Sequence, residues 1–380
     1  MSTRVIINTK IYTGNEIIEN GFIRYTDKID EIGLMESYVP IQEDVQDGQG
    51  DIIIPGMIDV HIHGGYEIDV MDANANTLVK LSHELMKEGV TTFFPTTMTQ
   101  AHASIEKALQ AAKEAKEIGA HFEYMHLEGP FVSKKRAGAQ PLEHIVKPDV
   151  DLFKKWQEIS GGLIKLVTYA PEEEGAQELE LVFQETGVIG SCGHTDAYAH
   201  DFQGRNIPHA THLYNQMRGL HHREPGVVGQ VLLNPNVMVE VITDGIHIHP
   251  DMVKLAYMLK GPKKVSVITD AMRAKGLEEG TYELGGQPVY VKEGSARLED
   301  GTLAGSILTM DAAFRNVIAF TGCSIEEAVW MTSINQAKEF GLKNKGTLEA
   351  GKDADFVVMS QDLYVKDTIR LGKHMNEVSE

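Results

Sequence analysis

Two histidines separated by one residue stand at the end of a mostly apolar run. His61 and His63 follow the segment 52–60, IIIPGMIDV. Side chains at positions i and i+2 of a strand point to the same face, so the two imidazoles are placed to bind one metal ion together. Neutral imidazole is a ligand for zinc and other first-row metals. Taken alone, the pair is equally compatible with surface histidines at a strand end.

Four more residues with metal-binding or acid–base side chains stand at the ends of other apolar runs. Glu128 ends the run at 124–128, and His194 follows the run at 188–192. His212 and Asp270 occupy the same place in two later runs. Each residue taken singly is also compatible with a core histidine or a strand-end ion pair. A set of four histidines and two carboxylates at such positions favours a metal site.

The elements that must position these residues are short apolar runs alternating with longer amphipathic segments from residue 52 onward. This alternation is typical of a parallel sheet with crossover helices. Eight βα units match a TIM barrel, in which the active site lies at the carboxyl ends of the strands. The expected strands are Met57–His63, Thr91–Thr96, Glu123–Glu128, Leu163–Tyr169, Val188–His194, His209–Leu213, Val237–Thr243 and Val265–Asp270.

The two ends of the chain have a different pattern from the middle. Residues 1–50 alternate short β-like pieces with polar turns, and the chain returns to β-like character after residue 345. The two ends are expected to pair with each other. We therefore predict an α/β protein with two domains: a small β-sandwich from residues 1–54 and 346–380, and a (β/α)8 barrel from 55–345. A hairpin insertion is expected at 280–301.

A hydrolytic mechanism follows from these residue types. A divalent metal lowers the pKa of its bound water, and a nearby carboxylate takes the proton as the metal-bound hydroxide attacks a carbonyl. Asp270 is the candidate for this general acid/base, which then protonates the departing nitrogen. The metal also stabilises the developing oxyanion.

A basic loop follows the sixth expected strand. The segment 215–226, NQMRGLHHREPG, holds two arginines and two histidines in a chain of net charge -20. Local positive charge of this kind suits a phosphate group, for which arginine offers paired donors. His247 is placed to reach the same ligand. The alternative is a solvated charged loop or a subunit contact.

The composition excludes several classes of partner. A net charge of -20 argues against nucleic acid and anionic membrane surfaces, both of which require basic protein surface. No run of about 18 apolar residues is present, so no membrane span is expected. Two cysteines do not make a disulfide framework, and no apolar signal core stands near Met1, so a cytoplasmic location is expected.

These segments together resemble the amidohydrolase superfamily and, within it, the N-acetylglucosamine-6-phosphate deacetylase family. The HxH pair is typical of the superfamily, whereas the HLEGP and HHREPG segments are specific to the deacetylases. The resemblance covers the chain nearly from end to end. It is carried by PGMIDVHIHG (55–64), HLEGPF (126–131), GHT (193–195), THLYN (211–215), HHREPG (221–226), DGIH (244–247) and TDA (269–271).

The resemblance implies a (β/α)8 barrel with a small β-sandwich, assembled as a homodimer. The implied reaction removes acetate from N-acetylglucosamine 6-phosphate and yields glucosamine 6-phosphate. Asp270 resembles the general acid/base, and Arg223 is expected to reach the neighbouring subunit's site. The implied metal ligands are Glu128, His194 and His212, with His61 and His63 for a second ion. The implied substrate contacts are Ala139, Gln140, Asn215, Gln216, Arg223, His247, Leu303, Ala304 and Gly305.

Some choices stay open at the level of sequence. The ligand set suits one or two divalent ions, with zinc or iron expected first and manganese or cobalt also compatible. Gln140 stands where some family members have histidine, and Gln216 replaces a smaller residue. Other candidate activities are deacetylation of the galactosamine epimer and D-aminoacylase or cyclic-amide hydrolysis. A catalytically silent barrel is disfavoured because Asp270 stands beside a full ligand set.

Overall fold

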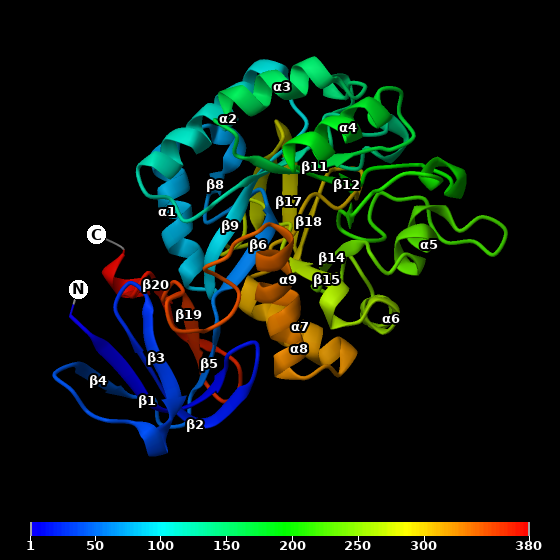
Figure 1. Cartoon of the computed structure of the whole chain (residues 1–380). Coiled ribbons are helices and arrows are strands. Elements are labelled where there is room, and N and C mark those ends of the chain that lie inside the picture. Colours follow the sequence, from blue (N-terminus) through cyan, green and yellow to red (C-terminus); the bar gives the residue numbers. More distant parts are fainter. Residues whose placement is uncertain (1, 379–380) are drawn as a thin grey trace. The chain divides into compact units, whose positions relative to one another are not determined.

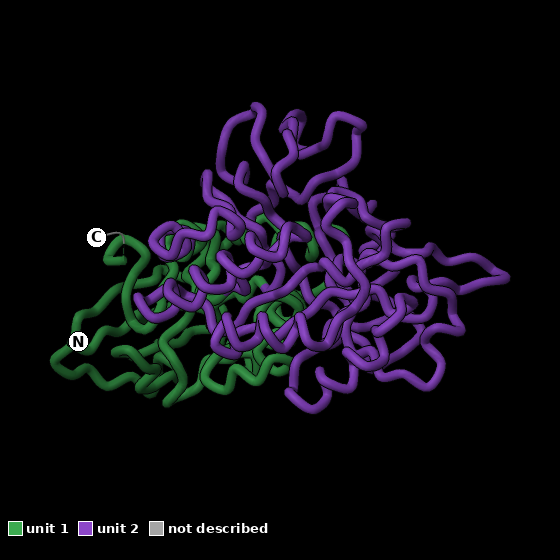
Figure 2. Tube along the Cα trace, turned by 90° about the horizontal axis from the view of Figure 1, so that it is seen from above, with its two compact units in different colours: residues 1–59, 82–92, 310–380 green, residues 60–81, 93–309 purple. Residues whose placement is uncertain are grey.

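The computed structural model describes residues 2–378, which form two compact units (Figure 2). The first unit comprises residues 1–59, 82–92 and 310–380, and the second comprises 60–81 and 93–309. The first unit contains both ranges that we predicted for the small domain, with additional segments. The boundaries at residues 54 and 345 stay a prediction.

The first unit is built on an eight-stranded sheet that both ends of the chain share. Strand β5 (Ile52–Pro55) pairs antiparallel with β19 (Phe356–Met359), so early and late strands lie side by side (Figure 1). The strand order is β21-β20-β19-β5-β1-β2-β3, and β4 pairs with β1. The remaining strands are β1 (Arg4–Tyr12), β2 (Ile17–Tyr25), β3 (Ile29–Leu34), β4 (Asp44–Asp47), β20 (Val365–Arg370) and β21 (Lys373–His374).

The core of this sheet is aliphatic and aromatic. Ile6, Ile23, Tyr25 and Phe356 are fully or almost fully buried in one cluster. Burial of apolar side chains from both chain ends stabilises their pairing. The same unit holds the late helices α7 (Met310–Thr321), α8 (Ile325–Val329) and α9 (Asn335–Glu339), with a π-helical segment, Trp330–Ile334, between the last two.

The second sheet is the predicted barrel. Its strands are arranged in chain order, β15-β14-β13-β12-β11-β10-β9-β6, and the neighbours from β9 to β15 pair in parallel. The Asp270 amide donates to the His61 carbonyl at 2.9 Å and so links the last strand end to the first. The strands are β6 (Met57–Ile62), β9 (Val90–Thr97), β10 (Met125–Glu128), β11 (Ile164–Tyr169), β12 (Ile189–Cys192), β13 (His209–Ala210), β14 (Met238–Ile242) and β15 (Val265–Ile268).

Three barrel strands end two or three residues earlier than the sequence predicts. We expected strands to reach His194, Leu213 and Asp270, but they end at Cys192, Ala210 and Ile268. The reason is local: the backbone φ angles of His194, His212 and Asp270 are 48°, 26° and 48°. These left-handed conformations cannot continue a strand.

α-Helices follow most of the barrel strands along the chain (Figure 1), whereas β12 is followed by a short 3-10 helix, Ala199–Phe202. These α-helices are α1 (Ala75–Met86), α2 (His102–Glu117), α3 (Val150–Ile159), α4 (Ala176–Thr186), α5 (Gly226–Leu233) and α6 (Pro250–Lys260). Asp149 marks the start of α3 by accepting a hydrogen bond from the Leu152 amide. Within residues 2–378, no helix is both long enough and apolar enough to cross a bilayer.

The predicted hairpin insertion is a three-stranded sheet. It consists of β16 (Gly280–Leu284), β17 (Gln287–Lys292) and β18 (Ser295–Arg297). Its apolar face joins a buried cluster that includes Met98, Met272 and Leu284. A short hairpin of β7 (Gly64–Gly65) and β8 (Ile68–Asp69) follows the first barrel strand.

Candidate active site

The structure brings together all six residues predicted for metal binding and acid–base chemistry. Glu128 ends β10, His61 lies in β6 and His63 directly follows it. The other three, His194, His212 and Asp270, each lie two residues beyond a strand end. All six side chains are buried at the carboxyl ends of the barrel strands, the place where the barrel architecture puts an active site.

One group of ligand atoms forms around a single oxygen of Glu128. Its Oε1 lies 3.3 Å from His194 Nε2 and 3.1 Å from His212 Nε2. The two Nε2 atoms are 3.1 Å from each other. One carboxylate oxygen and two imidazole nitrogens therefore converge on one small volume.

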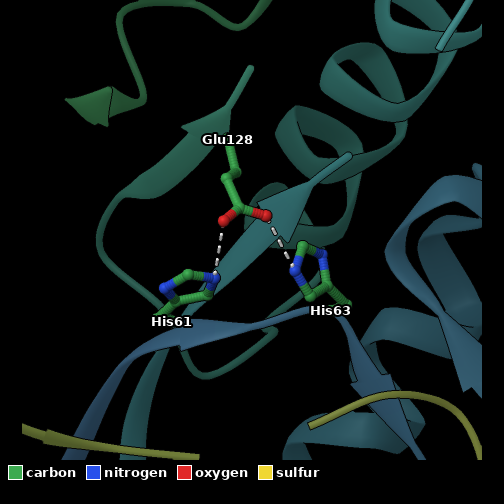
Figure 3. Close-up of side chains that lie close together, drawn as sticks. All are labelled: His61, His63 and Glu128. Carbon is green, nitrogen blue, oxygen red and sulfur yellow. Dashed lines mark ion pairs between the residues drawn. The ribbon is translucent and has the colours of Figure 1, made fainter. Parts of the chain in front are cut away.

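A second group of ligand atoms contacts the same carboxylate. Glu128 Oε2 lies 3.1 Å from His63 Nε2, and Oε1 lies 3.5 Å from His61 Nε2. Figure 3 shows the carboxylate pointing at both rings. Asp270 Oδ1 is 3.3 Å from each of the same two nitrogens. Glu128 thus belongs to both groups of ligand atoms.

The spacing of these atoms fits a divalent metal. With metal–nitrogen and metal–oxygen bonds of about 2.0–2.1 Å, ligands in a tetrahedral site lie about 3.3 Å apart. The distances of 3.1–3.3 Å around Glu128 Oε1 match that value. Imidazole nitrogens and carboxylate oxygens are also the donor types that zinc, iron, manganese and cobalt accept.

The outer nitrogens of the histidines have partners that leave the inner nitrogens available. His194 Nδ1 lies 2.8 Å from the Arg136 carbonyl, and His63 Nδ1 lies 3.2 Å from the Thr96 carbonyl. A carbonyl only accepts, so both Nδ1 atoms carry a proton, and Nε2 is the nitrogen of each ring that a metal ion would take. His61 Nδ1 instead lies 2.9 Å from a carboxylate oxygen of Glu240. Such partners orient metal-binding histidines in proteins.

The electrostatics of the site favour bound positive charge. Burial lowers the pKa of His61, but the carboxylates of Asp270, Glu128 and Glu240 outweigh it and hold that pKa well above its usual value. Burial likewise opposes protonation of His63, and hydrogen bonds to Asp270 and Glu128 raise its pKa to about 9. Burial raises the pKa of Glu128, but the nearby histidines hold it well below its usual range. A divalent cation would supply the same compensating charge.

The backbone of three site residues is strained. His194, His212 and Asp270 all have positive φ, which costs on the order of 1–3 kcal/mol for a residue other than glycine. Backbone hydrogen bonds hold all three: the Ser133 amide donates to the His194 carbonyl at 2.8 Å, the Ser306 amide to the Asp270 carbonyl at 2.8 Å, and the Asn215 amide to the His212 carbonyl at 3.0 Å. Strain of this kind is concentrated at functional sites.

A pocket opens directly over the ligand groups. Seven of the predicted substrate-binding residues line it: Ala139, Gln140, Asn215, Gln216, His247, Leu303 and Gly305. Ala304 is fully buried and is not in the pocket wall. Arg223 also lies outside the pocket, on the exposed loop, with Nη1 2.7 Å from His222 Nε2.

The three-stranded insertion supplies part of the pocket wall. Leu284 of β16 lines the pocket together with Met98. Two glutamines attach the insertion to neighbouring loops: Gln287 Nε2 donates to the Ala139 carbonyl at 2.8 Å, and Gln100 Nε2 donates to the Gly285 carbonyl at 2.6 Å. The insertion is therefore hydrogen-bonded to Ala139, which is a predicted substrate contact.

Sequence reasoning missed one carboxylate of this site. Glu240 lies in the middle of β14 and is fully buried, with its carboxylate against His61 and His209. One signal was present in the sequence: a charged residue inside the apolar run VMVEVI. Charged side chains are almost never fully buried unless they are paired.

Comparison with known proteins agrees with this geometry. The model of the amidohydrolase family matches residues 52–375. The chain belongs to the amidohydrolase family. It is 47% identical to the N-acetylglucosamine-6-phosphate deacetylase of Bacillus subtilis (strain 168), over 97% of this chain and 96% of that protein. This level of identity places the amidohydrolase chain within the deacetylase family and confirms the prediction that it is an amide-hydrolysing enzyme.

Two further relatives are informative about fold and specificity. A mutant N-acetyl-D-glucosamine-6-phosphate deacetylase from Mycobacterium smegmatis, in complex with N-acetyl-D-glucosamine-6-phosphate, superposes with a TM-score of 0.94 at 29% identity, covering 99% of this chain and 100% of that one. The N-acetylgalactosamine-6-phosphate deacetylase of Escherichia coli O157:H7 is 32% identical, over 96% of this chain and 97% of that protein. The predicted barrel with a small β-sandwich is confirmed by the first of these.

Proposed function

We propose that this amidohydrolase hydrolyses the acetamide of N-acetyl-D-glucosamine 6-phosphate to D-glucosamine 6-phosphate and acetate. One observation carries the proposal: four histidine nitrogens meet the two oxygens of Glu128 beside Asp270, at the floor of a polar pocket. The 47% identity to a relative named for this reaction supports the choice of substrate.

We propose the two groups of ligand atoms as the metal sites. Glu128, His194 and His212 would hold one ion, and His61 and His63 with Glu128 would hold a second. When bound, a divalent ion supplies a water of lowered pKa and polarises the acetamide carbonyl. We propose one or two ions per chain, with zinc or iron first and manganese or cobalt as compatible substitutes.

Asp270 is proposed as the general acid/base. Burial raises its pKa, but the charge of His61 and the hydrogen bond with His63 outweigh this effect and hold the pKa below its ordinary value. Its carboxylate is therefore ionised and able to accept a proton from the attacking water. The same oxygen then donates that proton to the nitrogen, which leaves as a neutral amine.

The pocket wall supplies the proposed sugar contacts. Asn215, Gln216 and His247 present polar side chains, while Ala139, Leu303 and Gly305 shape the opening, next to the buried Ala304. Asp244 orients His247, because its Oδ2 lies 2.6 Å from His247 Nδ1. The Gln140 side-chain amide donates a hydrogen bond to Glu128, and we propose that Gln140 contacts substrate as well.

A phosphate group is bound best by arginine or lysine. Among residues 2–378, no lysine or arginine lines this pocket. The chain as a whole has a net charge of -20, which opposes the binding of an anion. We therefore propose a homodimer in which the exposed Arg223 of one subunit reaches the phosphate in the site of the other.

Deacetylation of the galactosamine epimer is the second candidate. The relative named for that reaction matches nearly the whole chain, although at a lower identity of 32%. The two hexosamines differ in the orientation of one hydroxyl, so polar pocket residues such as Asn215 and Gln216 would decide between them.

The test is acetate release by metal-reconstituted protein from three compounds: N-acetylglucosamine 6-phosphate, its unphosphorylated form and N-acetylgalactosamine 6-phosphate. Selective turnover of the first is the expected result. Equal turnover without phosphate would remove the role of Arg223, and preference for the galactosamine compound would establish the second candidate. No release from any of the three would overturn the proposed substrate class.

A further inference from the structure

Glu240 connects three strands of the barrel beneath the ligand groups. The residue lies in β14, and its Oε2 is 2.9 Å from His61 Nδ1, in the first barrel strand. The same oxygen accepts a hydrogen bond from the His212 amide at 3.1 Å. Its Oε1 lies 3.1 Å from Nε2 of His209, in β13. This fully buried carboxylate thus contacts the His61 ring of the second ligand group and the backbone of His212 in the first.

His61 is distinguished from the other site histidines by this contact. The partners of His63 Nδ1 and His194 Nδ1 are neutral backbone carbonyls, Thr96 and Arg136. Only His61, among these three, has a carboxylate as its Nδ1 partner. A carboxylate makes the opposite nitrogen of an imidazole a stronger metal ligand than a carbonyl does, because it stabilises positive charge on the ring.

The His61 ring is also fixed in orientation. It packs edge-to-face against His126, with the ring centroids 4.5 Å apart and the planes at 85°. His126 in turn has its Nε2 2.7 Å from the Thr168 hydroxyl oxygen. With Glu240 on Nδ1 and His126 against its face, His61 has one orientation in which Nε2 points toward Glu128 and Asp270.

We propose that Glu240 is a positioning residue that sets the metal affinity of the position formed by His61 and His63. It acts through His61 and does not touch the substrate pocket, whose lining does not include it. The metal affinity of the position formed by His194 and His212 depends less on Glu240. There the Glu240 carboxylate contacts the His212 backbone amide and not an imidazole nitrogen. The inference rests on the proposed metal dependence but not on the proposed substrate.

The test is metal binding by the variant Glu240→Gln, which keeps the shape of the side chain and removes its charge. Metal-depleted protein is titrated with cobalt, and bound ions are counted while the visible absorption of each site is followed. We expect affinity at the second ion to fall about 10–100-fold, with the first ion bound as in the unsubstituted protein. The melting temperature of the metal-free variant reports whether folding is intact.

Glu180→Gln is the matched control. Glu180 is a buried carboxylate in α4, bonded to the Tyr169 hydroxyl and the Arg205 guanidinium, neither of which belongs to the ligand groups. Its substitution should leave both cobalt affinities unchanged. A double variant with His61→Gln gives the coupling: once His61 is replaced, Glu240→Gln should have no further effect on cobalt binding.

The proposal would be overturned by unchanged cobalt affinities in Glu240→Gln, or by an equal loss of affinity with and without His61. Binding of a single ion that is insensitive to both substitutions would overturn it as well. Acetate release is not a readout here. A protein that shows the expected cobalt behaviour but does not hydrolyse the sugar phosphates would disprove the proposed substrate and leave the role of Glu240 intact.

Discussion

Gln140 Nε2 donates a hydrogen bond of 3.0 Å to Glu128 Oε2. The Thr99 amide donates to Gln140 Oε1 at 2.9 Å, so the orientation of the side-chain amide is defined, with its nitrogen toward Glu128. Because Glu128 belongs to both groups of ligand atoms, Gln140 holds the carboxylate on which both depend. Gln140 therefore has a specific partner in this chain.

Replacement of Gln140 by leucine should weaken metal binding by about 10–100-fold, because it keeps the bulk and removes the hydrogen bond to Glu128. The measurement is the number of ions retained per chain across a series of chelator concentrations. Gln100→Leu is the matched control, since Gln100 bonds to the Gly285 carbonyl and not to a metal-binding group. Retention of metal by Gln140→Leu at unsubstituted levels would show that the hydrogen bond does not support Glu128.

Asp270→Asn should retain metal and lose activity. The substitution removes the proton acceptor, and general acid–base catalysis contributes about 10²–10⁴-fold to rate. We expect kcat for acetate release to fall by that factor, with bound metal measured on the same sample. Unchanged turnover with an intact metal content would disprove the general acid/base assignment.

Removal of metal should destabilise the protein as well as inactivate it. Without a cation, the buried carboxylates of Glu128, Asp270 and Glu240 have only protonated histidines to compensate their charge. A ligand at about 1,000 times its Kd adds about 4 kcal/mol to the free energy of unfolding. Calorimetry with and without chelator measures the shift in melting temperature, and re-addition of zinc or iron should reverse it.

The matched variant for that experiment is Glu128→Gln, in which the oxygen atoms shared by both ligand groups are no longer a carboxylate. Its melting temperature should respond much less to chelator. An equal response in both proteins would mean that the stabilising metal binds elsewhere.

The sequence predicts most of this site for a physical reason. Strand ends of a parallel barrel meet at one face, so the types of residue that close each apolar run are enough to bring His61, Glu128 and His194 together. The same logic could not find Gln140, which reaches Glu128 from a loop whose path depends on tertiary packing. The strand-end rule also passed over Glu240, because the signal of this residue is a charge in the middle of an apolar run. The early ends of three strands depend on positive φ angles that no propensity predicts.

Lys260 should make the stability depend on pH. Burial, and to a lesser extent Lys264, lowers its pKa to about 8 from 10.5. Between these two values the unfolded chain binds more protons than the folded chain, so stability rises with pH. Between pH 7.5 and 9.5 the free energy of unfolding should increase by about 1–2 kcal/mol through this group. Urea titrations at both pH values measure it.

In Lys260→Met this contribution should be lost, although the variant also lacks the hydrogen bond to the Val231 carbonyl. Only the change with pH is therefore compared. Lys154→Met replaces an exposed lysine and should keep the slope of the unsubstituted protein. Equal slopes in all three proteins would show that the Lys260 pKa is not lowered in the folded chain.

Arg223 provides a test of whether the proposed dimer shares its sites. Arg223→Ala and Asp270→Asn should each abolish most turnover of N-acetylglucosamine 6-phosphate when all subunits carry the same substitution. In a mixed dimer, the subunit with Arg223→Ala keeps Asp270, and its partner keeps Arg223. If Arg223 acts on the neighbouring site, one complete site forms in that dimer.

Co-expression of the two variants with different affinity tags isolates the mixed dimer, and acetate release is measured against each parent. We expect about half the activity of the unsubstituted dimer, because one of its two sites is complete. Arg297→Ala is the control: Arg297 is an exposed arginine on β18 that bonds to the Gly301 carbonyl and should not affect turnover. A mixed dimer as inactive as both parents would show that Arg223 serves its own chain, and a monomeric protein would remove the shared site altogether.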